Sequence, residues 1–231
     1  MVYVSSLDGR VTHKRMENHY VPVMLNCSGR RCIVIGGGKV AERKIEALAG
    51  SGALLTIISP KVTEKILHMV DRGEAEWRKK PYLQGDLEGA FLVYAAASNP
   101  EVNAQVIAEA KQRNILVNSA DAPSTGDFIT PGSVRRGKLT IAVSASGASP
   151  GLAKQIIEQL RTDYGDEYQI YLDFLQQFRE VIQFEVEDRR DRKRLLDRVL
   201  EMDILVQIRE ERYRPWSQEE MIKWITANRE E

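Results

Sequence analysis

The sequence contains little of what disulfide scaffolds, metal sites and membrane spans are built from. It has two cysteines and three histidines in 231 residues, with no cluster of His, Cys and Glu at metal-ligand spacing. Two thiols cannot form a closed zinc site, and we expect no permanent metal site. No apolar run approaches the roughly 20 residues that span a bilayer. The 33 Lys and Arg residues balance 33 Asp and Glu residues, so no net charge attracts nucleic acid or an anionic membrane.

The N-terminal segment also lacks the apolar stretch of a secretory signal, because it carries Asp8, Arg10 and Lys14. We therefore expect a cytoplasmic protein with reduced thiols, in which Cys32 belongs to a buried strand. Residues 1–17 are polar and aperiodic, and we predict that they form a disordered extension.

Residues 18–122 alternate short apolar runs with stretches of helical periodicity. The apolar runs begin near Cys32, Leu54, Phe91 and Ile115, with a weaker one around Trp77. Each main run is continuously apolar, as in a strand that is buried on both faces. Strands that alternate with helices of this length predict a parallel sheet with right-handed crossovers. The predicted fold class is therefore α/β, with a Rossmann-type parallel sheet in residues 18–122.

After Asp121 the pattern changes to that of an antiparallel hairpin. Residues 128–134 are predicted to be extended, residues 135–138 to form a turn, and residues 139–143 to form a half-buried strand. We assign this small α+β region to residues 123–150.

A helical C-terminal domain is predicted over residues 151–231. Its apolar residues form stripes at helical spacing, which indicate helices that pack against one another rather than a ligand site. Ser217, followed three residues later by Glu220, is the pattern of a capping box at the start of a helix.

A glycine-rich loop follows the first strand and opens a helix. Gly36-x-Gly38-x-x-Ala41 matches the G-x-G-x-x-G/A fingerprint of dinucleotide binding, and its place between strand and helix is the context that the fingerprint requires. Gly36 allows a tight turn, Gly38 lets the backbone approach a pyrophosphate, and Ala41 lets helix and strand pack closely. The alternative is a purely structural glycine turn. The predicted cofactor contacts at this loop and at the N-terminus of its helix are Gly36, Gly37, Gly38, Lys39 and Val40.

The end of the second strand leaves the identity of the cofactor open. NAD-specific sites usually carry an acidic residue there, which binds the adenosine ribose, whereas this chain has Ser59. The Ser59 hydroxyl can still bond a ribose hydroxyl, while Lys61 can tolerate a 2′-phosphate. The residues alone therefore do not decide between NAD and NADP.

A polar cluster, residues 118–124, lies just beyond the fifth predicted strand, at the sheet edge where α/β proteins bind ligands. Within it, Asp121 is either a general base or a turn-forming residue before Pro123. Spacing alone leaves both interpretations open.

Several motifs together resemble those of a known family. They are, in chain order, Tyr20-Val21-Pro22-Val23, Gly29-Arg30, residues 34–44, Val117-Asn118, Asp121-Ala122-Pro123, Phe128-Ile129-Thr130-Pro131 and residues 144–150. In combination they resemble the precorrin-2 dehydrogenase/sirohydrochlorin ferrochelatase family, which forms the N-terminal module of siroheme synthases. The resemblance is close over about residues 18–160 and general in the helical remainder.

The resemblance implies an enzyme that uses NAD to oxidise precorrin-2 to sirohydrochlorin, and that in many members also inserts Fe²⁺ to give siroheme. It implies a homodimer in which the segment after Asp121 exchanges between subunits, so that residues 123–150 become a dimerisation and active-site segment. Asp121 matches the main catalytic aspartate of the family. Because some members that only dehydrogenate lack this aspartate, its presence favours a bifunctional enzyme. A dehydrogenase without chelatase activity is the alternative.

The expected site combines the glycine-rich loop with the polar cluster of residues 118–124. The nicotinamide should lie at the carboxyl edge of the sheet, where small side chains leave room, and Asp121 should take a proton as general base. Further cofactor contacts are therefore expected at Ser59, Ala96, Ala97 and Ser98. The carboxylates of the tetrapyrrole are expected to contact Asn118, Ser124, Arg135, Arg136, Lys138, Ser146 and Gly147. The basic residues among them would equally suit a charged hairpin turn.

Two other functions fit the same glycine loop. A non-catalytic NAD-sensing module would bind the cofactor without a tetrapyrrole. An unrelated small-molecule dehydrogenase would usually place a His or Lys acid/base after the Rossmann domain, and no histidine follows His68.

Overall fold

A computed structural model of the chain describes residues 20–229. The chain divides into two compact units, Met1–Thr130 and Pro131–Glu231. The extension predicted at residues 1–17 lies outside the described residues. Within the described part, none of the helices combines the length and the apolarity that a bilayer crossing requires.

The first unit is a parallel sheet with helices on both faces. Its elements, in chain order, are β1 (Arg31–Ile35), α1 (Lys39–Leu48), β2 (Leu54–Ile58), α2 (Glu64–Asp71), β3 (Glu76–Arg78), β4 (Leu92–Ala95), α3 (Pro100–Gln112) and β5 (Leu116–Ser119). The strands lie in the order β3-β2-β1-β4-β5, and every neighbouring pair is parallel. This confirms the predicted Rossmann-type sheet. The strand order reverses between β1 and β4, the kind of switch point where α/β sheets bind ligands.

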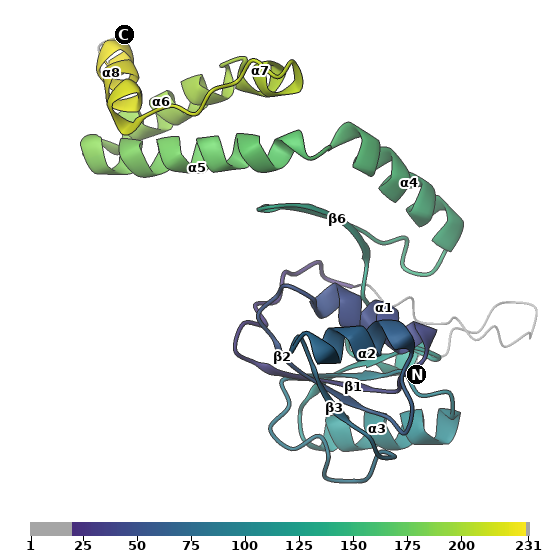
Figure 1. Cartoon of the computed structure of the whole chain (residues 1–231). Coiled ribbons are helices and arrows are strands. Elements are labelled where there is room, and N and C mark those ends of the chain that lie inside the picture. The colour runs from purple at the N-terminus through teal and green to yellow at the C-terminus, as the bar shows by residue number, and fades with distance from the viewer. Residues whose placement is uncertain (1–19, 230–231) are drawn as a thin grey trace, which may run out of the picture. The chain divides into compact units, whose positions relative to one another are not determined.

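Both faces of the sheet are buried. Helices α1 and α2 cover one face and α3 covers the other (Figure 1). In the central strand β1, Cys32 and Val34 lie in the core beneath α1 and α2, whereas Ile33 and Ile35 lie in the core beneath α3. Because both sets are apolar, the strand appears in the sequence as a continuous apolar run.

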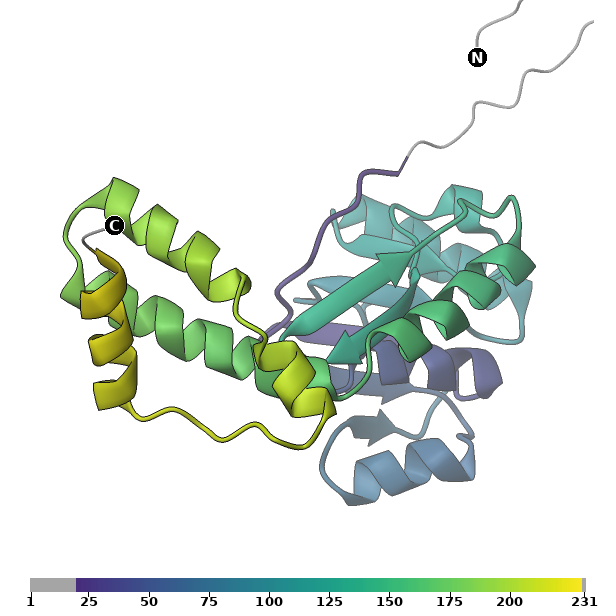
Figure 2. The ribbon, with the colours of Figure 1, turned by 90° about the horizontal axis from the view of Figure 1, so that it is seen from above.

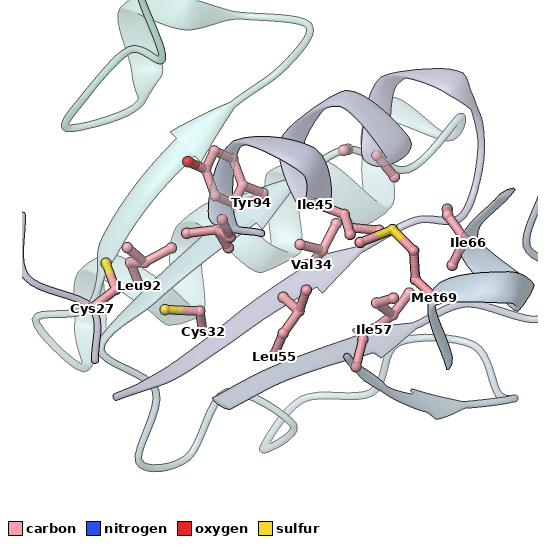
Figure 3. Packing of buried hydrophobic residues seen from close by; sticks show 14 residues of the cluster. Cys27, Cys32, Val34, Ile45, Leu55, Ile57, Ile66, Met69, Leu92 and Tyr94 are labelled. Carbon is pink, nitrogen blue, oxygen red and sulfur yellow. The ribbon is translucent and has the colours of Figure 1, made fainter. Parts of the chain in front are cut away.

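The core beneath α1 and α2 contains both cysteines (Figure 3). Cys27 and Cys32 are free thiols that are 5% and 0% exposed. Burial, and then the neighbouring Cys27, raise the pKa of the Cys32 thiol far above its usual value. Cys32 therefore behaves as a small apolar residue of β1, as the sequence predicts.

The segment that follows β5 folds back against that strand. The Asp127 carboxylate accepts a hydrogen bond from the Val117 N–H at 2.9 Å, and the Asp127 N–H donates to the Val117 carbonyl at 2.7 Å. The Asn118 side-chain amide donates to the Phe128 carbonyl at 2.7 Å. These bonds close the loop that contains Asp121 and hold it beside the carboxyl end of the sheet.

The second unit begins with an antiparallel hairpin and continues as helices. Its elements are β6 (Gly132–Arg136), β7 (Leu139–Val143), α4 (Pro150–Asp163), α5 (Glu167–Glu185), α6 (Arg189–Leu200), α7 (Ile204–Arg209) and α8 (Gln218–Arg229). The hairpin turn is shorter than the predicted 135–138, because Arg135 and Arg136 belong to β6. The turn needs a residue with positive φ, which Gly137 supplies with a φ of 53°.

Helices α6, α7 and α8 pack against the long helix α5 (Figure 2). The Phe178 ring, on α5, lies 5.5 Å from the Trp216 ring and 5.4 Å from the Trp224 ring, centre to centre. Helix α8 begins at the predicted capping box. The Ser217 hydroxyl accepts from the Glu220 N–H at 3.2 Å, and the Glu220 carboxylate accepts from the Ser217 N–H at 2.8 Å.

Candidate functional site

The glycine loop joins β1 to α1 and packs against the end of β4. Gly36 has a φ of 121°, a conformation that L side chains rarely adopt. A Cβ atom at Gly36 would lie 2.2 Å from the Ala96 carbonyl oxygen, and one at Gly37 would lie 2.0 Å from the Lys61 carbonyl oxygen. Any side chain at these two positions would displace the backbone of a neighbouring segment.

Gly38, in contrast, faces open space where α1 begins. Among the described residues other than its chain neighbours, no atom lies within 4 Å of the position that its Cβ would occupy. Gly38 caps the helix without a side-chain hydrogen bond. The N–H groups of Lys39 and Val40 have no acceptor within the helix and lie at its positive end. An open surface beside free N–H donors fits a pyrophosphate.

The loop after β2 is hydrogen-bonded to the glycine loop and to helix α1. The Thr63 N–H donates to the Gly37 carbonyl at 3.0 Å, and the Thr63 hydroxyl donates to the Glu42 carboxylate at 2.7 Å. The bond from Thr63, helped by the charge of Lys39, lowers the pKa of Glu42. These contacts set the shape of the loop independently of any ligand.

Ser59, which is predicted to contact the adenosine ribose, is 7% exposed. Its hydroxyl donates to the Lys61 carbonyl at 2.7 Å, and its own carbonyl accepts from the Trp77 indole N–H at 2.9 Å. The hydroxyl oxygen keeps a lone pair, although its proton is already engaged. Ser59 thus shapes the end of β2, and its contact with a ribose stays a prediction.

The carboxyl end of β4 forms the predicted nicotinamide edge. Ala96 is buried and donates its N–H to the Ile35 carbonyl at 2.9 Å, whereas Ala97 is half-buried and Ser98 is exposed. The Ala97 backbone is held by Asn103, near the start of α3. Asn103 Oδ1 accepts from the Ala97 N–H at 2.9 Å, and Asn103 Nδ2 donates to the Ala97 carbonyl at 3.0 Å.

Asp121 lies next to the same asparagine. Its Oδ2 accepts a hydrogen bond from Asn103 Nδ2, and its Oδ1 accepts one from Ser119 Oγ, both at 2.9 Å. Asp121 is exposed, whereas Asn103 and Ser119 are each 2% exposed. These bonds, first that from Asn103, lower the pKa of Asp121 because they favour the charged carboxylate. The result is an ionised carboxylate in a fixed orientation and open to solvent, as a general base requires.

The predicted site did not include Asn103. Its signal in the sequence is a polar residue on the helix face that also carries Val106 and Ala110, both fully buried. The spacing i, i+3 and i+7 places all three on one side of α3. A polar side chain on a buried face needs a hydrogen-bond partner, but the sequence does not show which partner.

The other predicted contacts in the first unit differ in exposure. Asn118 is 2% exposed, its amide is engaged with Phe128, and its Oδ1 is buried without a hydrogen-bond partner among the described residues. Asn118 therefore holds the segment that contains Asp121. Ser124 is exposed in the short 3-10 helix Pro123–Thr125 of the same loop. Direct contact of either residue with a substrate stays a prediction.

The predicted cations lie in the second unit. Arg136 pairs with Asp166 at 3.1 Å, and Lys138 pairs with Asp173. Arg135 is exposed, and within residues 20–229 no ion pair involves it. Of the three cations, Arg135 therefore has its charge most available for an anionic ligand.

Ser146 and Gly147 lie in the exposed turn before α4, with φ angles of 49° and 84°. The helix itself is capped by Ser149, whose hydroxyl accepts from the Leu152 N–H at 3.2 Å. In the part of the chain that the structure describes, no three His, Cys, Asp or Glu residues are grouped so that they could hold a metal ion.

Comparisons with known proteins show which families this chain is similar to. A family model described as "Putative NAD(P)-binding" matches residues 23–132, which include the glycine loop and Asp121. A siroheme synthase of Nitrosococcus oceani is 34% identical over 189 residues, which are 82% of this chain and 40% of that protein. A siroheme synthase of Pseudomonas fluorescens is 38% identical over 143 residues, which are 62% of this chain and 31% of that protein.

The chain is also similar in three-dimensional structure to a solved protein. It is described as "SirC, precorrin-2 dehydrogenase", with a TM-score of 0.73 and 29% sequence identity, and the match covers 90% of this chain and all of that one. The siroheme synthases are longer proteins, of which the chain spans 40% or less.

Proposed function

Because the chain belongs to the precorrin-2 dehydrogenase/sirohydrochlorin ferrochelatase family, we propose that it oxidises precorrin-2 to sirohydrochlorin with NAD as the hydride acceptor. A nicotinamide cofactor is supported by the family model. The tetrapyrrole substrate is supported by the relatives, which are siroheme synthases and a precorrin-2 dehydrogenase. The choice of NAD over NADP follows from the family resemblance.

The observation that carries the proposal is the place of Asp121. This ionised, exposed carboxylate is joined through Asn103 to the backbone of Ala97, and the neighbouring Ala96 carbonyl packs against the glycine loop. A proton acceptor therefore lies beside the edge where the nicotinamide is expected. An oxidation that removes a hydride and a proton needs these two functions close together.

Different residues of this chain would bind the cofactor and transfer the proton in that reaction. A bound NAD supplies the acceptor for the hydride. The N–H groups of Lys39 and Val40 would bind its pyrophosphate, and the short side chains of Ala96 and Ala97 leave room for its nicotinamide ring. Asp121 takes the proton that precorrin-2 loses, since its carboxylate is ionised and exposed to solvent.

The direct test supplies enzymatically prepared precorrin-2 with NAD and follows sirohydrochlorin and NADH by absorbance. Equal amounts of the two products support the proposal. The variant Asp121→Asn keeps the size of the side chain but cannot take the proton, and its turnover should fall by at least about 100-fold. The dissociation constant of NADH serves as the control and should not change. A protein that binds NADH but turns over with neither NAD nor NADP would instead be a non-catalytic sensing module.

The same carboxylate supports a second proposed activity, the insertion of Fe²⁺ into sirohydrochlorin. Insertion releases two pyrrole N–H protons, and an ionised Asp121 can accept them one at a time. The test supplies sirohydrochlorin and Fe²⁺ under anaerobic conditions and follows the spectrum of siroheme. Insertion no faster than in the absence of protein would leave a dehydrogenase without chelatase activity.

We also propose a homodimer whose sites combine the Asp121 loop with the cations of the exchanged segment. Arg135 would bind a substrate carboxylate, so Arg135→Ala should raise KM for precorrin-2 and leave kcat nearly unchanged. Mixing unfolded Arg135→Ala and Asp121→Asn chains and refolding them together tests the exchange. A heterodimer then has one site with both defects and one intact site, so at precorrin-2 concentrations well below KM the mixture should be more active than either variant. Activity no higher than the average of the two variants would place both residues in one subunit.

A further inference from the structure

We propose that Asn103 is a positioning residue that couples the nicotinamide edge of the sheet to the Asp121 carboxylate. The inference rests on the proposed function, since it gives Asn103 a part in the same site. Asn103 would set the distance between the place where the hydride leaves and the group that takes the proton.

The hydrogen bonds of Asn103 use the two ends of its amide for different partners. Oδ1 accepts from the Ala97 N–H, and Nδ2 donates both to the Ala97 carbonyl and to Asp121 Oδ2. Both amide hydrogens and the amide oxygen are therefore engaged. If the amide nitrogen and oxygen exchanged places, the nitrogen would face the Ala97 N–H. The oxygen would face the Ala97 carbonyl oxygen and Asp121 Oδ2. The partners thus determine the orientation of the amide.

The environment of Asn103 makes this arrangement rigid. The residue is 2% exposed, so water cannot readily replace any of its three partners. Its helix is anchored independently, because Val106 and Ala110 on the same face are fully buried. A buried amide with satisfied bonds to two segments fixes those segments relative to each other.

The coupling reaches the glycine loop through a short chain of contacts. The Ala96 carbonyl limits how closely Gly36 can approach, the next residue Ala97 is held by Asn103, and Asn103 holds Asp121. A ligand that contacts residues 96–97 and shifts their backbone would therefore also shift the Asn103 amide, which orients the Asp121 carboxylate.

Ser119 lacks this double role. Its hydroxyl donates to Asp121 Oδ1 and accepts from the Ala122 N–H at 3.1 Å, so its bonds stay within the loop that contains Asp121. The two residues therefore form a matched pair: both orient Asp121, and only Asn103 also holds the cofactor edge. The lowered pKa of Asp121, to which Asn103 contributes most and Ser119 less, agrees with two separate donors.

The test uses two variants of Asn103 and two measurements that need no tetrapyrrole. Asn103→Leu removes all three bonds at similar size, and Asn103→Asp keeps the acceptor for the Ala97 N–H while removing both donors. The Asp121 carboxyl is titrated by ¹³C NMR in the protein without cofactor, with its signal assigned by its loss in Asp121→Asn. The NADH dissociation constant is measured by fluorescence.

Both Asn103 variants should raise the pKa of Asp121, because a donor to the charged form is lost in each and Asn103→Asp also adds the repulsion of a second carboxylate. NADH binding should weaken on the order of three- to tenfold in Asn103→Leu and less in Asn103→Asp. If Asn103→Leu does not fold, Asn103→Ala carries the test, since it also removes all three bonds and introduces no charge beside Asp121.

Two controls separate coupling from general loosening. Ser119→Ala should raise the pKa of Asp121 and leave NADH binding unchanged. Asn99→Ala removes the cap of α3, a bond from the Glu101 N–H at 2.8 Å, and should change neither measurement. If Asn99→Ala changes both as strongly as the Asn103 variants do, the effect is helix loosening and the proposal is overturned.

Two further outcomes would also overturn the coupling. An unchanged Asp121 titration in the Asn103 variants would make Asn103 a structural residue only, and a changed titration with unchanged NADH binding would make it a partner of Asp121 only. A protein that shows both expected changes but does not oxidise precorrin-2 would count against the proposed function and not against the coupling.

Discussion

Gly36 lies so close to Ala96 that a methyl group on Gly36 would come within 2.2 Å of the Ala96 carbonyl oxygen. Two residues later, the same methyl on Gly38 would point into open space. The two glycines therefore serve different purposes. Gly36 lets the loop pack against the protein, and Gly38 leaves a surface free for a ligand.

Substitution by alanine should separate these two purposes. Gly36→Ala combines a backbone clash with an unfavourable φ and should lower the free energy of unfolding by at least roughly 2 kcal/mol. Gly38→Ala should stay within about 1 kcal/mol of the parent protein but weaken NADH binding on the order of tenfold. Urea unfolding and NADH fluorescence provide the two measurements. Equal stability of the two variants would contradict the packing of Gly36 against Ala96.

The pH dependence of the reaction should follow Asp121. Hydrogen bonds from Asn103 and Ser119 lower its pKa, so the base is ionised above this lowered value and is lost as pH falls through it. We expect kcat/KM to decline only below the range in which a free Asp titrates. Ser119→Ala removes one donor and should move this decline to higher pH. An acid limb at the same pH in both proteins would show that another group controls it.

The capping box of α8 should contribute to the stability of the second unit. Ser217→Ala removes the acceptor for the Glu220 N–H and should cost roughly 1 kcal/mol, measured by urea unfolding with circular dichroism. Thr226→Ala, a hydroxyl deletion within the same helix, is the control and should cost less.

The Glu220 carboxylate in this capping box gives the stability a pH dependence. Its bonds from Arg214 and from the Ser217 N–H lower its pKa to about 2. The charged Glu220 therefore stabilises the folded unit at pH values above the ordinary pKa of Glu. This stabilisation is lost as the pH falls towards the lowered pKa of Glu220. Glu220→Gln should remove this part of the pH dependence in acid unfolding curves, and an unchanged acid limb would contradict the role of its charge.

The two thiols should be unreactive in the folded protein. Burial raises the pKa of Cys32, and Cys27 is 5% exposed, so a reagent in solution has little access to either sulfur. A thiol reagent at mildly alkaline pH should label both only as fast as the protein opens, and both at once in denaturant. Cys27→Ser and Cys32→Ser identify which thiol is labelled, and rapid labelling of native protein would contradict the burial of the pair.

The sheet could be predicted from the sequence because its signals are local. Each strand of the centre is apolar on both faces, and the glycine loop lies directly between β1 and α1. The hairpin was less well predicted at its turn, because Arg135 and Arg136 are polar and resemble loop residues. Strand β6 with its buried Val134 continues to Arg136, and the turn consists of Gly137 and Lys138, of which Gly137 has the positive φ.

Hydrogen bonds between distant segments could not be predicted in the same way. Asn103 meets Asp121 eighteen positions later in the sequence, and the Asn118 amide donates to the Phe128 carbonyl ten positions later. A polar residue at an inward position indicates that it has a partner, but the identity of the partner depends on how the strands and loops come together.

The bond from the Trp77 indole to the Ser59 carbonyl has an optical consequence. The chain has three tryptophans, and the other two, Trp216 and Trp224, belong to the aromatic core of the helical unit. Replacing that pair with phenylalanine would leave a single tryptophan, which lies in β3 and is hydrogen-bonded to the end of β2. Because indole emission overlaps the absorption of a reduced nicotinamide, energy transfer from Trp77 would report the binding of the cofactor in real time, with no tryptophan emission from the helical unit.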